Sequence, residues 1–221
     1  MNLEAITEND YQTVVSEYAN HVSEKGYQFT SDWFSYHTHN WKCFLPQKFA
    51  NVPSLNFLEI GSWEARSTCW LLENVLTHDS ARITCVDTFA GSVEHIAMGY
   101  DSNLLQTIES RFDFNVGLTG YPEKVRKIVG ASQEVLRSLP LNSYDLIYID
   151  GSHIASDVLE DAILSWRLLR KNGWMMFDDY DWPGSHDYNH PKIGIDAFLS
   201  AFGNKVNILH KSYQVILEKV V

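Results

Sequence analysis

Short apolar runs alternate with helical stretches along the chain from Leu55 onward. The runs are rich in β-branched and aromatic residues, and each one ends in, or is followed directly by, an acidic residue or a glycine. This pattern is typical of a parallel sheet covered by helices on both faces. The predicted fold is therefore α/β with an open, mostly parallel sheet, whose strands are expected at residues 56–60, 82–87, 125–129, 144–150 and 174–177.

A helix is predicted between the fourth and fifth runs. Apolar residues recur there at three- and four-residue spacing from Ala155 to Leu169, opposite charged residues, which indicates an amphipathic helix. Gly173 is its expected end. Residues 205–210 and 213–220 read as two strands joined by Lys211 and Ser212, which predicts an antiparallel hairpin at one edge of the sheet.

The first 50 residues differ from the rest of the chain in their pattern of apolar and polar residues. The stretch Asp32–Trp41 is aromatic and polar, with neither helical nor alternating periodicity. We therefore predict an N-terminal helical and irregular cap over residues 1–50 and a sheet domain over residues 51–221.

Composition and charge exclude several classes of protein. Of 221 residues, 45% are hydrophobic, 20% charged and 13% aromatic, which excludes disorder and coiled coil for the whole chain. The formal net charge of -11 repels phosphate backbones and acidic membranes. We expect no nucleic-acid partner and no membrane association.

Targeting signals and cysteines point to a reducing compartment. Residues 1–6 lack a basic stretch followed by an apolar one, and nowhere do about 18 apolar residues follow one another. Cys43, Cys69 and Cys85 are odd in number and form no C-x-x-C pattern, so neither a disulfide framework nor a thiolate zinc site is indicated. A cytoplasmic protein with buried thiols is expected.

The first candidate binding feature is a glycine turn that joins the first predicted strand to a helix, Glu59-Ile60-Gly61-Ser62-Trp63-Glu64-Ala65-Arg66-Ser67-Thr68. Ligands of open parallel sheets bind beyond the carboxyl ends of the strands, and helix amides there face the ligand. Gly61 lets a nucleotide-like ligand approach the backbone. The G-x-G-x-x-G fingerprint is absent because Trp63 and Ala65 replace two glycines, which disfavours pyrophosphate. An ordinary strand-to-helix turn is the alternative.

Two further strand ends carry groups suited to a nucleoside. Asp87 ends the second strand, where a carboxylate can accept both hydroxyls of a ribose. Ser132 and Gln133 follow the third strand and offer hydrogen bonds to the edge of an adenine. Taken singly, each is also explained as a helix cap or a turn residue.

Acidic residues crowd the ends of the fourth and fifth strands. Asp150 is followed by Gly-Ser-His153, and Asp178 and Asp179 follow the next strand. Carboxylates brought together in this way repel one another unless a cation lies among them, and oxygen ligands select Mg²⁺ first, then Mn²⁺ or Ca²⁺. His153 beside such an ion would have a lowered pKa and, as a neutral ring, could accept a proton. Solvated loop acids and a structural histidine are the alternatives.

These motifs, in this order and spacing, resemble class I S-adenosylmethionine-dependent methyltransferases. Within that class the chain resembles the metal-dependent O-methyltransferases, which include the catechol type and, closer still, the macrolide-sugar (mycinamicin and macrocin) branch. The resemblance covers roughly residues 55–180, and its specific part is Asp150-Gly-Ser-His153 followed by the acids Asp178 and Asp179.

The resemblance implies a Rossmann-like methyltransferase sheet with S-adenosylmethionine (SAM) and Mg²⁺ or Mn²⁺ as cofactors. By resemblance, Asp150, Asp178 and Asp179 would hold the metal, and His153 would act as the base, where the catechol type commonly has lysine. The implied cofactor contacts are Glu59, Gly61, Ser62, Trp63, Asp87, Ser132, Gln133 and Asp150. Ala65, at the usual third glycine, would be tolerated if its backbone were helical.

By the same resemblance, a histidine base is a feature of the sugar-modifying branch, which implies a hydroxyl of a sugar or of a glycosylated small molecule as the acceptor. A catechol-like phenol is the alternative acceptor. Two less favoured functions are a nicotinamide-dependent oxidoreductase and a non-catalytic SAM-binding module. The absent G-x-G-x-x-G counts against the oxidoreductase, and the complete set of acids and base counts against the non-catalytic module. The loop Tyr180–Pro191 is expected to shape the acceptor pocket. Residues 1–50 would cover either that pocket or the interface of a homo-oligomer.

Overall fold

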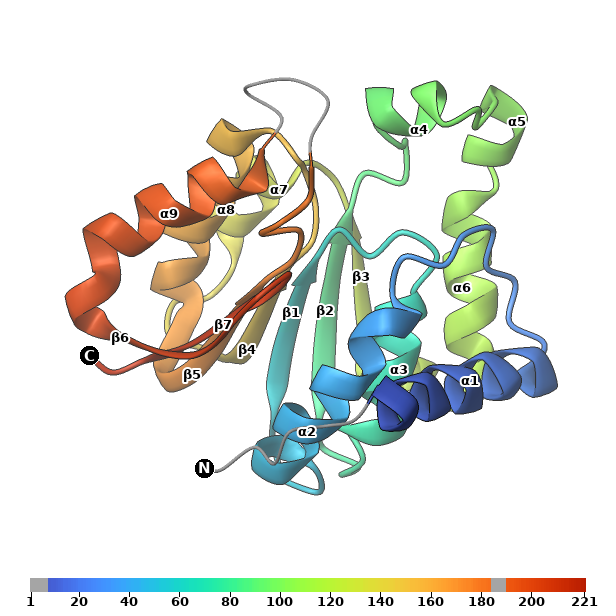
Figure 1. Ribbon diagram of the computed structural model, residues 1–221, viewed down its shortest axis with the longest axis horizontal. Coiled ribbons are helices and arrows are strands. Elements are labelled where there is room, and N and C mark those ends of the chain that lie inside the picture. The colour runs from blue at the N-terminus through green and yellow to red at the C-terminus, as the bar shows by residue number, and fades with distance from the viewer. Residues whose placement is uncertain (1–7, 184–189) are drawn as a thin grey trace.

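A single seven-stranded sheet organises the molecule, seen in a computed structural model that describes residues 8–183 and 190–221 (Figure 1). The strand order is β3-β2-β1-β4-β5-β7-β6. Strands β1 to β5 pair in parallel, and β7 runs antiparallel to both β5 and β6, as predicted. The strands are β1 (Asn56–Ile60), β2 (Arg82–Asp87), β3 (Val125–Val129), β4 (Tyr144–Ile149), β5 (Leu169–Phe177), β6 (Val206–Lys211) and β7 (Val215–Lys219).

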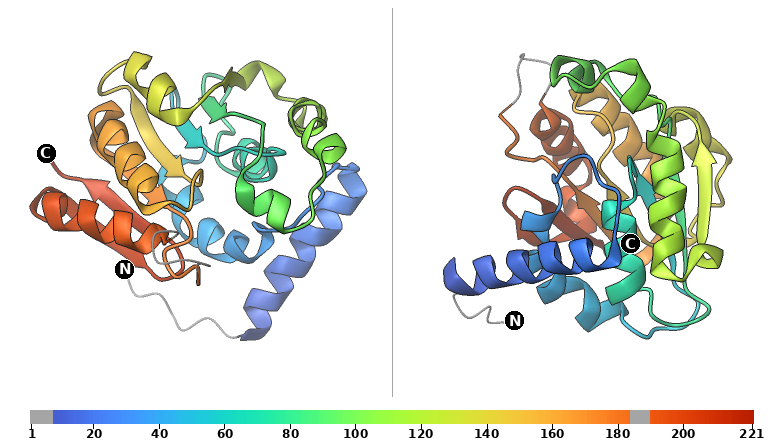
Figure 2. Two further views of the ribbon diagram at one scale, coloured as in Figure 1. Left: turned by 90° about the horizontal axis from the view of Figure 1, so that it is seen from above. Right: turned by 90° about the vertical axis from the view of Figure 1, so that its right-hand side faces the viewer.

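Helices cover both faces of the sheet (Figure 2). One buried hydrophobic cluster joins the sheet to α1, α2, α3 and α6, and a second joins the other face to α8 and α9. The α-helices are α1 (Glu8–Lys25), α2 (Thr38–Phe49), α3 (Arg66–Asn74), α4 (Val93–Ala97), α5 (Ser102–Leu105), α6 (Ile108–Thr119), α7 (Ser132–Val135), α8 (Ala155–Leu168) and α9 (Pro191–Phe202). Short 3₁₀ turns are η1 (Ser35–His37), η2 (Pro122–Lys124), η3 (Leu136–Ser138) and η4 (Gly203–Lys205).

The N-terminal segment contains the expected helices and shares the core of the sheet. Trp41 of α2 is fully buried and packs edge-on against Trp70 of α3 and Tyr148 of β4. Its indole Nε1 donates a hydrogen bond of 2.9 Å to Gln214 Oε1, just before β7. Residues 8–49 are therefore packed onto one face of the sheet and tied to the C-terminal hairpin.

The end of α8 corrects the prediction for Gly173. The helix ends at Leu168, and the chain enters β5 at Leu169, five residues earlier than predicted. Gly173 lies inside β5, where an added Cβ would be 2.8 Å from Leu169 Cδ1 and 2.9 Å from the Arg170 carbonyl oxygen. The polar start of this strand concealed it, and the glycine is needed for close packing rather than for ending a helix.

None of the helices in the described residues combines the length and the apolar character that crossing a membrane requires. The three cysteines are free; Cys69 and Cys85 are buried and Cys43 is half-buried.

Candidate active site

The carboxyl ends of the parallel strands open into a cavity of about 390 Å³. It lies where the strand order reverses, since β2 and β4 flank β1, the position at which open α/β sheets bind ligands. Of the residues predicted from the sequence, the cavity is lined by Gly61, Trp63, Asp87, Ser132, Gln133, Asp150, His153, Asp178 and Asp179. Strand ends more than 100 residues apart in the chain therefore meet at one cavity.

The turn after β1 has a left-handed backbone at three positions. Gly61 has φ +83°, and a Cβ there would be 1.9 Å from the Asp150 carbonyl oxygen, so this position requires glycine because the neighbouring strand end is so close. Trp63 (φ +44°) and Ala65 (φ +68°) adopt the same region despite their side chains. The condition under which Ala65 would be tolerated, a helical backbone, is not met: the residue precedes α3 in a left-handed conformation that a glycine would adopt without strain.

Asp87 is held in place by the backbone of two loops. Its Oδ2 accepts a hydrogen bond from Trp63 N at 2.8 Å, and its Oδ1 accepts one from Phe89 N at 2.7 Å. Burial raises the pKa of Asp87, and the hydrogen bonds from these two amides oppose that rise. Each carboxylate oxygen keeps a second lone pair, so the side chain can accept hydroxyl groups from the cavity.

Glu59 does not line this cavity, in contrast to what the resemblance implies. Its side chain is fully buried against α3, where the hydroxyls of Ser67 and Thr68 donate hydrogen bonds to its two oxygens. Burial raises the pKa of Glu59, and those hydroxyls oppose the rise. Glu59 joins β1 to α3. Ser62 is also buried and lines a smaller recess of about 60 Å³, together with Gly61 and Trp63.

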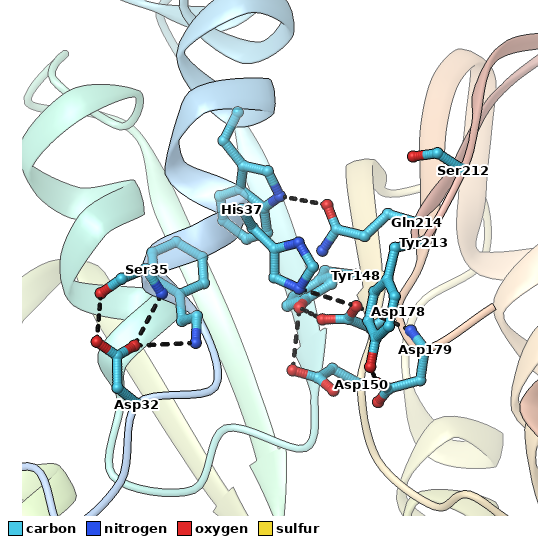
Figure 3. A network of polar contacts seen from close by, with 12 residues as sticks. Asp32, Ser35, His37, Tyr148, Asp150, Asp178, Asp179, Ser212, Tyr213 and Gln214 are labelled. Carbon is cyan, nitrogen blue, oxygen red and sulfur yellow. Dashed lines mark hydrogen bonds and ion pairs between the residues drawn. The ribbon is translucent and has the colours of Figure 1, made fainter. Parts of the chain in front are cut away.

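Asp150 and Asp178 meet as predicted, at the adjacent ends of β4 and β5 (Figure 3). The Tyr148 hydroxyl lies between them, 3.0 Å from Asp150 Oδ2 and in closer contact with Asp178 Oδ2. Burial, together with the charges of Asp178 and Asp179, raises the pKa of Asp150 well above its usual range. The single Tyr148 hydroxyl thus contacts both carboxyl groups and holds them side by side at the edge of the cavity.

His37, which the sequence did not single out, contacts the same pair. Its Nε2 lies 3.2 Å from Asp178 Oδ1, and both side chains are almost fully buried. Burial alone would raise the pKa of Asp178, but the neighbouring His37 and the Tyr148 hydroxyl outweigh it and lower the pKa. The N-terminal segment thus contributes directly to the acidic wall of the cavity.

Asp179 faces a different set of partners. Its backbone is left-handed (φ +57°), its Oδ1 accepts a hydrogen bond of 2.7 Å from the Tyr213 hydroxyl, and its Oδ2 lies 2.8 Å from His153 Nε2. The other ring nitrogen of His153 lies 2.9 Å from Glu94 Oε2. Burial lowers the pKa of His153, but Asp179 and Glu94 outweigh it, so that the pKa is raised. The lowered pKa expected from the sequence depended on a neighbouring cation, and Glu94 was not foreseen.

Aromatic side chains from distant segments complete the cavity. Trp33 and Tyr36 come from the N-terminal segment, Trp182 follows β5, and Tyr213 precedes β7. Trp63 stacks on His95 of α4, with ring centroids 4.1 Å apart and an interplanar angle of 19°. The loop predicted to shape the pocket thus supplies Trp182, while its residues 184–189 lie outside the described residues.

Residues 58–180 match the family described as the methyltransferase domain. An uncharacterized protein of Acanthamoeba polyphaga mimivirus is 26% identical over 131 residues, a match that covers 57% of this chain and 52% of that relative. The chain therefore spans about half the length of the curated relative it matches.

Two solved structures illustrate the likeness of the fold. An O-methyltransferase from Bacillus cereus in complex with SAH has a TM-score of 0.62 at 14% identity, covering 99% of this chain and 94% of that chain. TomG, an O-methyltransferase from Streptomyces achromogenes involved in tomaymycin synthesis, solved with SAM, has a TM-score of 0.61 at 14% identity, covering 99% and 92%. The predicted Rossmann-like sheet with its C-terminal antiparallel hairpin is confirmed.

Proposed function

Because this chain belongs to the methyltransferase domain family, we propose that it transfers the methyl group of SAM to a hydroxyl group of a small molecule. The observation that carries the proposal is the cavity at the carboxyl ends of β1 to β5, in which Asp87, Ser132 and Gln133 line one continuous space with Asp150 and His153. A nucleoside needs acceptors for its ribose hydroxyls and polar groups for its base, and these residues supply both.

The methyl carbon of a sulfonium is already electrophilic, so the protein's task is to activate and align the acceptor oxygen. His153 lines the cavity and is the candidate for receiving the hydroxyl proton, a role typically worth about 10²- to 10⁴-fold in rate. The oxygen, methyl carbon and sulfur must lie in line, with the reacting atoms about 3 Å apart. A rim built from strand ends provides the rigid positions that such alignment requires.

We also propose that Mg²⁺ or Mn²⁺ binds in the cavity, because the side chains there offer suitable oxygen ligands. Asp150, Asp178 and Asp179 all line the cavity and offer the oxygen ligands that these ions prefer. Within residues 8–183 and 190–221, however, no three histidine, cysteine or acidic side chains are grouped to hold a metal. The carboxylates of Asp178 and Asp179 instead contact Tyr148, His37 and Tyr213. When bound, the ion would stabilise the developing alkoxide.

For the acceptor we propose a hydroxyl of a sugar or of a glycosylated small molecule, with a catechol-like phenol as the alternative. The aromatic walls formed by Trp33, Tyr36, Trp182 and Tyr213, interspersed with carboxylates, suit the faces and hydroxyls of a sugar ring. They accept a phenol equally well, so turnover on a deoxysugar glycoside and on a catechol distinguishes the two.

Calorimetric titration with SAM tests the cofactor. We expect binding to the wild-type chain, about tenfold weaker binding to Asp87→Asn because ribose hydroxyls lose a charged acceptor, and no binding of NAD. Unchanged SAM affinity in that variant, or tighter binding of NAD than of SAM, would contradict the proposal.

Methyl transfer with and without Mg²⁺ tests the metal. Asp178→Ala is expected to abolish transfer while SAM binding largely survives. Full activity of the wild-type enzyme in excess chelator would remove the metal from the proposal and leave the transferase intact.

A further inference from the structure

Asp161 is a buried acid to which the proposed function gives no role. It belongs to the buried residues of α8, at 1% exposure, and its Oδ1 has no hydrogen-bond partner among the described residues. The neighbouring charges that act on it are those of two further acids, Asp157 and Glu160. A buried carboxyl in such surroundings lowers the stability of the fold. Its presence is therefore better explained by the groups that it contacts.

Those groups belong to two loops at the edge of the cavity. The side chain of Ser132, which follows β3, donates a hydrogen bond to Asp161. Gly151 follows β4, and a Cβ added there would be 3.8 Å from Asp161 Oδ2. One turn earlier in α8, Asp157 Oδ2 accepts a hydrogen bond of 2.9 Å from the Ser152 hydroxyl. Helix α8 thus presents two carboxyl groups to the loops that follow β3 and β4.

The contact with Asp161 determines which hydrogen-bonding groups Ser132 offers to a ligand. A hydroxyl has one proton and two lone pairs, and an ionised carboxylate only accepts hydrogen bonds. The single proton of the Ser132 hydroxyl therefore points to Asp161, and its lone pairs remain for the cavity, which Ser132 lines. Gln133 lines the same cavity, but its amide offers both donors and an acceptor and so suits ligands of either kind.

We propose that Asp161, acting through Ser132, makes the cofactor site selective for adenine over hypoxanthine; this inference rests on the proposed function, in which Ser132 and Gln133 face the base. The exocyclic amino group of adenine donates a hydrogen bond to the Ser132 oxygen. Hypoxanthine has a carbonyl oxygen in the same place, so two acceptors would face each other without a proton between them. Asp161 is a positioning residue, because it acts on the cofactor only through Ser132.

The test compares two ligands that differ only in the base, S-adenosylhomocysteine (SAH) and S-inosylhomocysteine, titrated calorimetrically into the full chain. The titrations are made at pH 8, where Asp161, with a pKa raised by burial to about 7, is mostly ionised. The wild-type chain should bind SAH at least about tenfold more tightly than the inosine compound. Equal affinities, or tighter binding of the inosine compound, would overturn this inference and leave the proposed function standing. Failure of SAH itself to bind would refute the proposed function and this inference with it.

A matched pair of variants assigns the selectivity to Asp161. Asp161→Asn keeps the shape of the side chain, but its amide nitrogen can donate to Ser132 and free the hydroxyl proton for the cavity. The two affinities should then lie within about threefold of each other. Glu160→Gln removes the same charge from the next residue of α8, whose side chain is 42% exposed and pairs with Arg137, and should keep the tenfold preference. A merely structural Asp161 would weaken both ligands alike, and such an unchanged ratio in Asp161→Asn would overturn its role.

Ser132→Ala tests the route through which Asp161 acts. This variant should also bring the two affinities to within about threefold, and adding Asp161→Asn to it should not change their ratio further. An unaltered preference for SAH in Ser132→Ala, or a further change of the ratio in the double variant, would overturn the inference.

Discussion

Asp161 makes the stability of this protein depend on pH in a direction that can be worked out from its surroundings. The side chain lies in α8 at 1% exposure, and its Oδ1 has no hydrogen-bond partner among the described residues. Burial raises the pKa of Asp161 to about 7, while a hydrogen bond from Ser132 opposes the rise. The folded state therefore holds a proton that the unfolded chain releases near pH 3.8.

The free energy of unfolding should consequently fall as pH rises from about 4 to 7. A rise in pKa from 3.8 to about 7 corresponds to roughly 4 kcal/mol of stability, of which about 2 kcal/mol is lost between pH 5 and pH 7. Asp161→Asn replaces the titrating group by a neutral one of the same shape. The stability of this variant relative to wild type should therefore increase by about 3 kcal/mol from pH 5 to pH 8.

Urea unfolding followed by tryptophan fluorescence at pH 5, 6, 7 and 8 measures this difference. Asp79→Asn, in an exposed loop, is the control and should give a stability curve parallel to that of wild type. If the stability difference between Asp161→Asn and wild type were the same at pH 5 and pH 8, the assignment of a buried, proton-binding carboxyl would be refuted.

Three further predictions concern the cavity. Gly61→Ala should lower the free energy of unfolding by more than about 2 kcal/mol in thermal melts, and the affinity for SAM at least tenfold by calorimetry. The reason is that the alanine Cβ would be 1.9 Å from the Asp150 carbonyl oxygen. Normal melting and binding would contradict the tight turn. Tyr148→Phe should cost about 1–3 kcal/mol in urea unfolding, since the buried Asp178 and the half-buried Asp150 lose their shared hydroxyl, while SAM affinity changes less than twofold. An unchanged unfolding midpoint would count against that network. His153→Ala should reduce the turnover number about a hundredfold or more with SAM affinity preserved, and turnover at the wild-type rate would remove His153 from the chemistry.

The sheet and most of the residues at the carboxyl ends of its strands could be predicted, because the sequence patterns that reveal them are local. Each parallel strand is a short apolar run, and the polar residue that follows it lies at the rim whatever the rest of the chain does. This reasoning located Asp87, Asp150 and Asp178. It misplaced the start of β5, where a polar stretch continues the strand beyond its apolar part.

The direction in which the Glu59 side chain points could have been predicted from the alternation of side chains along its strand. Successive side chains of a strand point to opposite faces. Phe57 belongs to the cluster beneath α3, and Leu58 and Ile60 belong to the cluster on the other face. Glu59 shares the face of Phe57, which directs its side chain towards α3 and away from the cavity.

His37, Glu94 and Trp33 could not be located from the sequence. His37 lies in the three-residue turn η1 and contacts Asp178, while Glu94 in the short helix α4 and Trp33 in the bend before η1 line the cavity. These contacts are tertiary, so the direction in which the pKa of His153 is shifted could not be judged without knowing of Glu94.

The hydrogen bond between Trp41 and Gln214 bears on how this protein can be trimmed or fused. The stretch that matches the methyltransferase domain ends before Gln214 and begins after Trp41, so excising it would separate both partners from the acids they surround. His37, one turn before Trp41, would be lost with the same cut, and Asp178 would lose its buried histidine neighbour. A truncated chain that keeps both contacts therefore extends beyond residues 58–180 and must include at least residues 37–214.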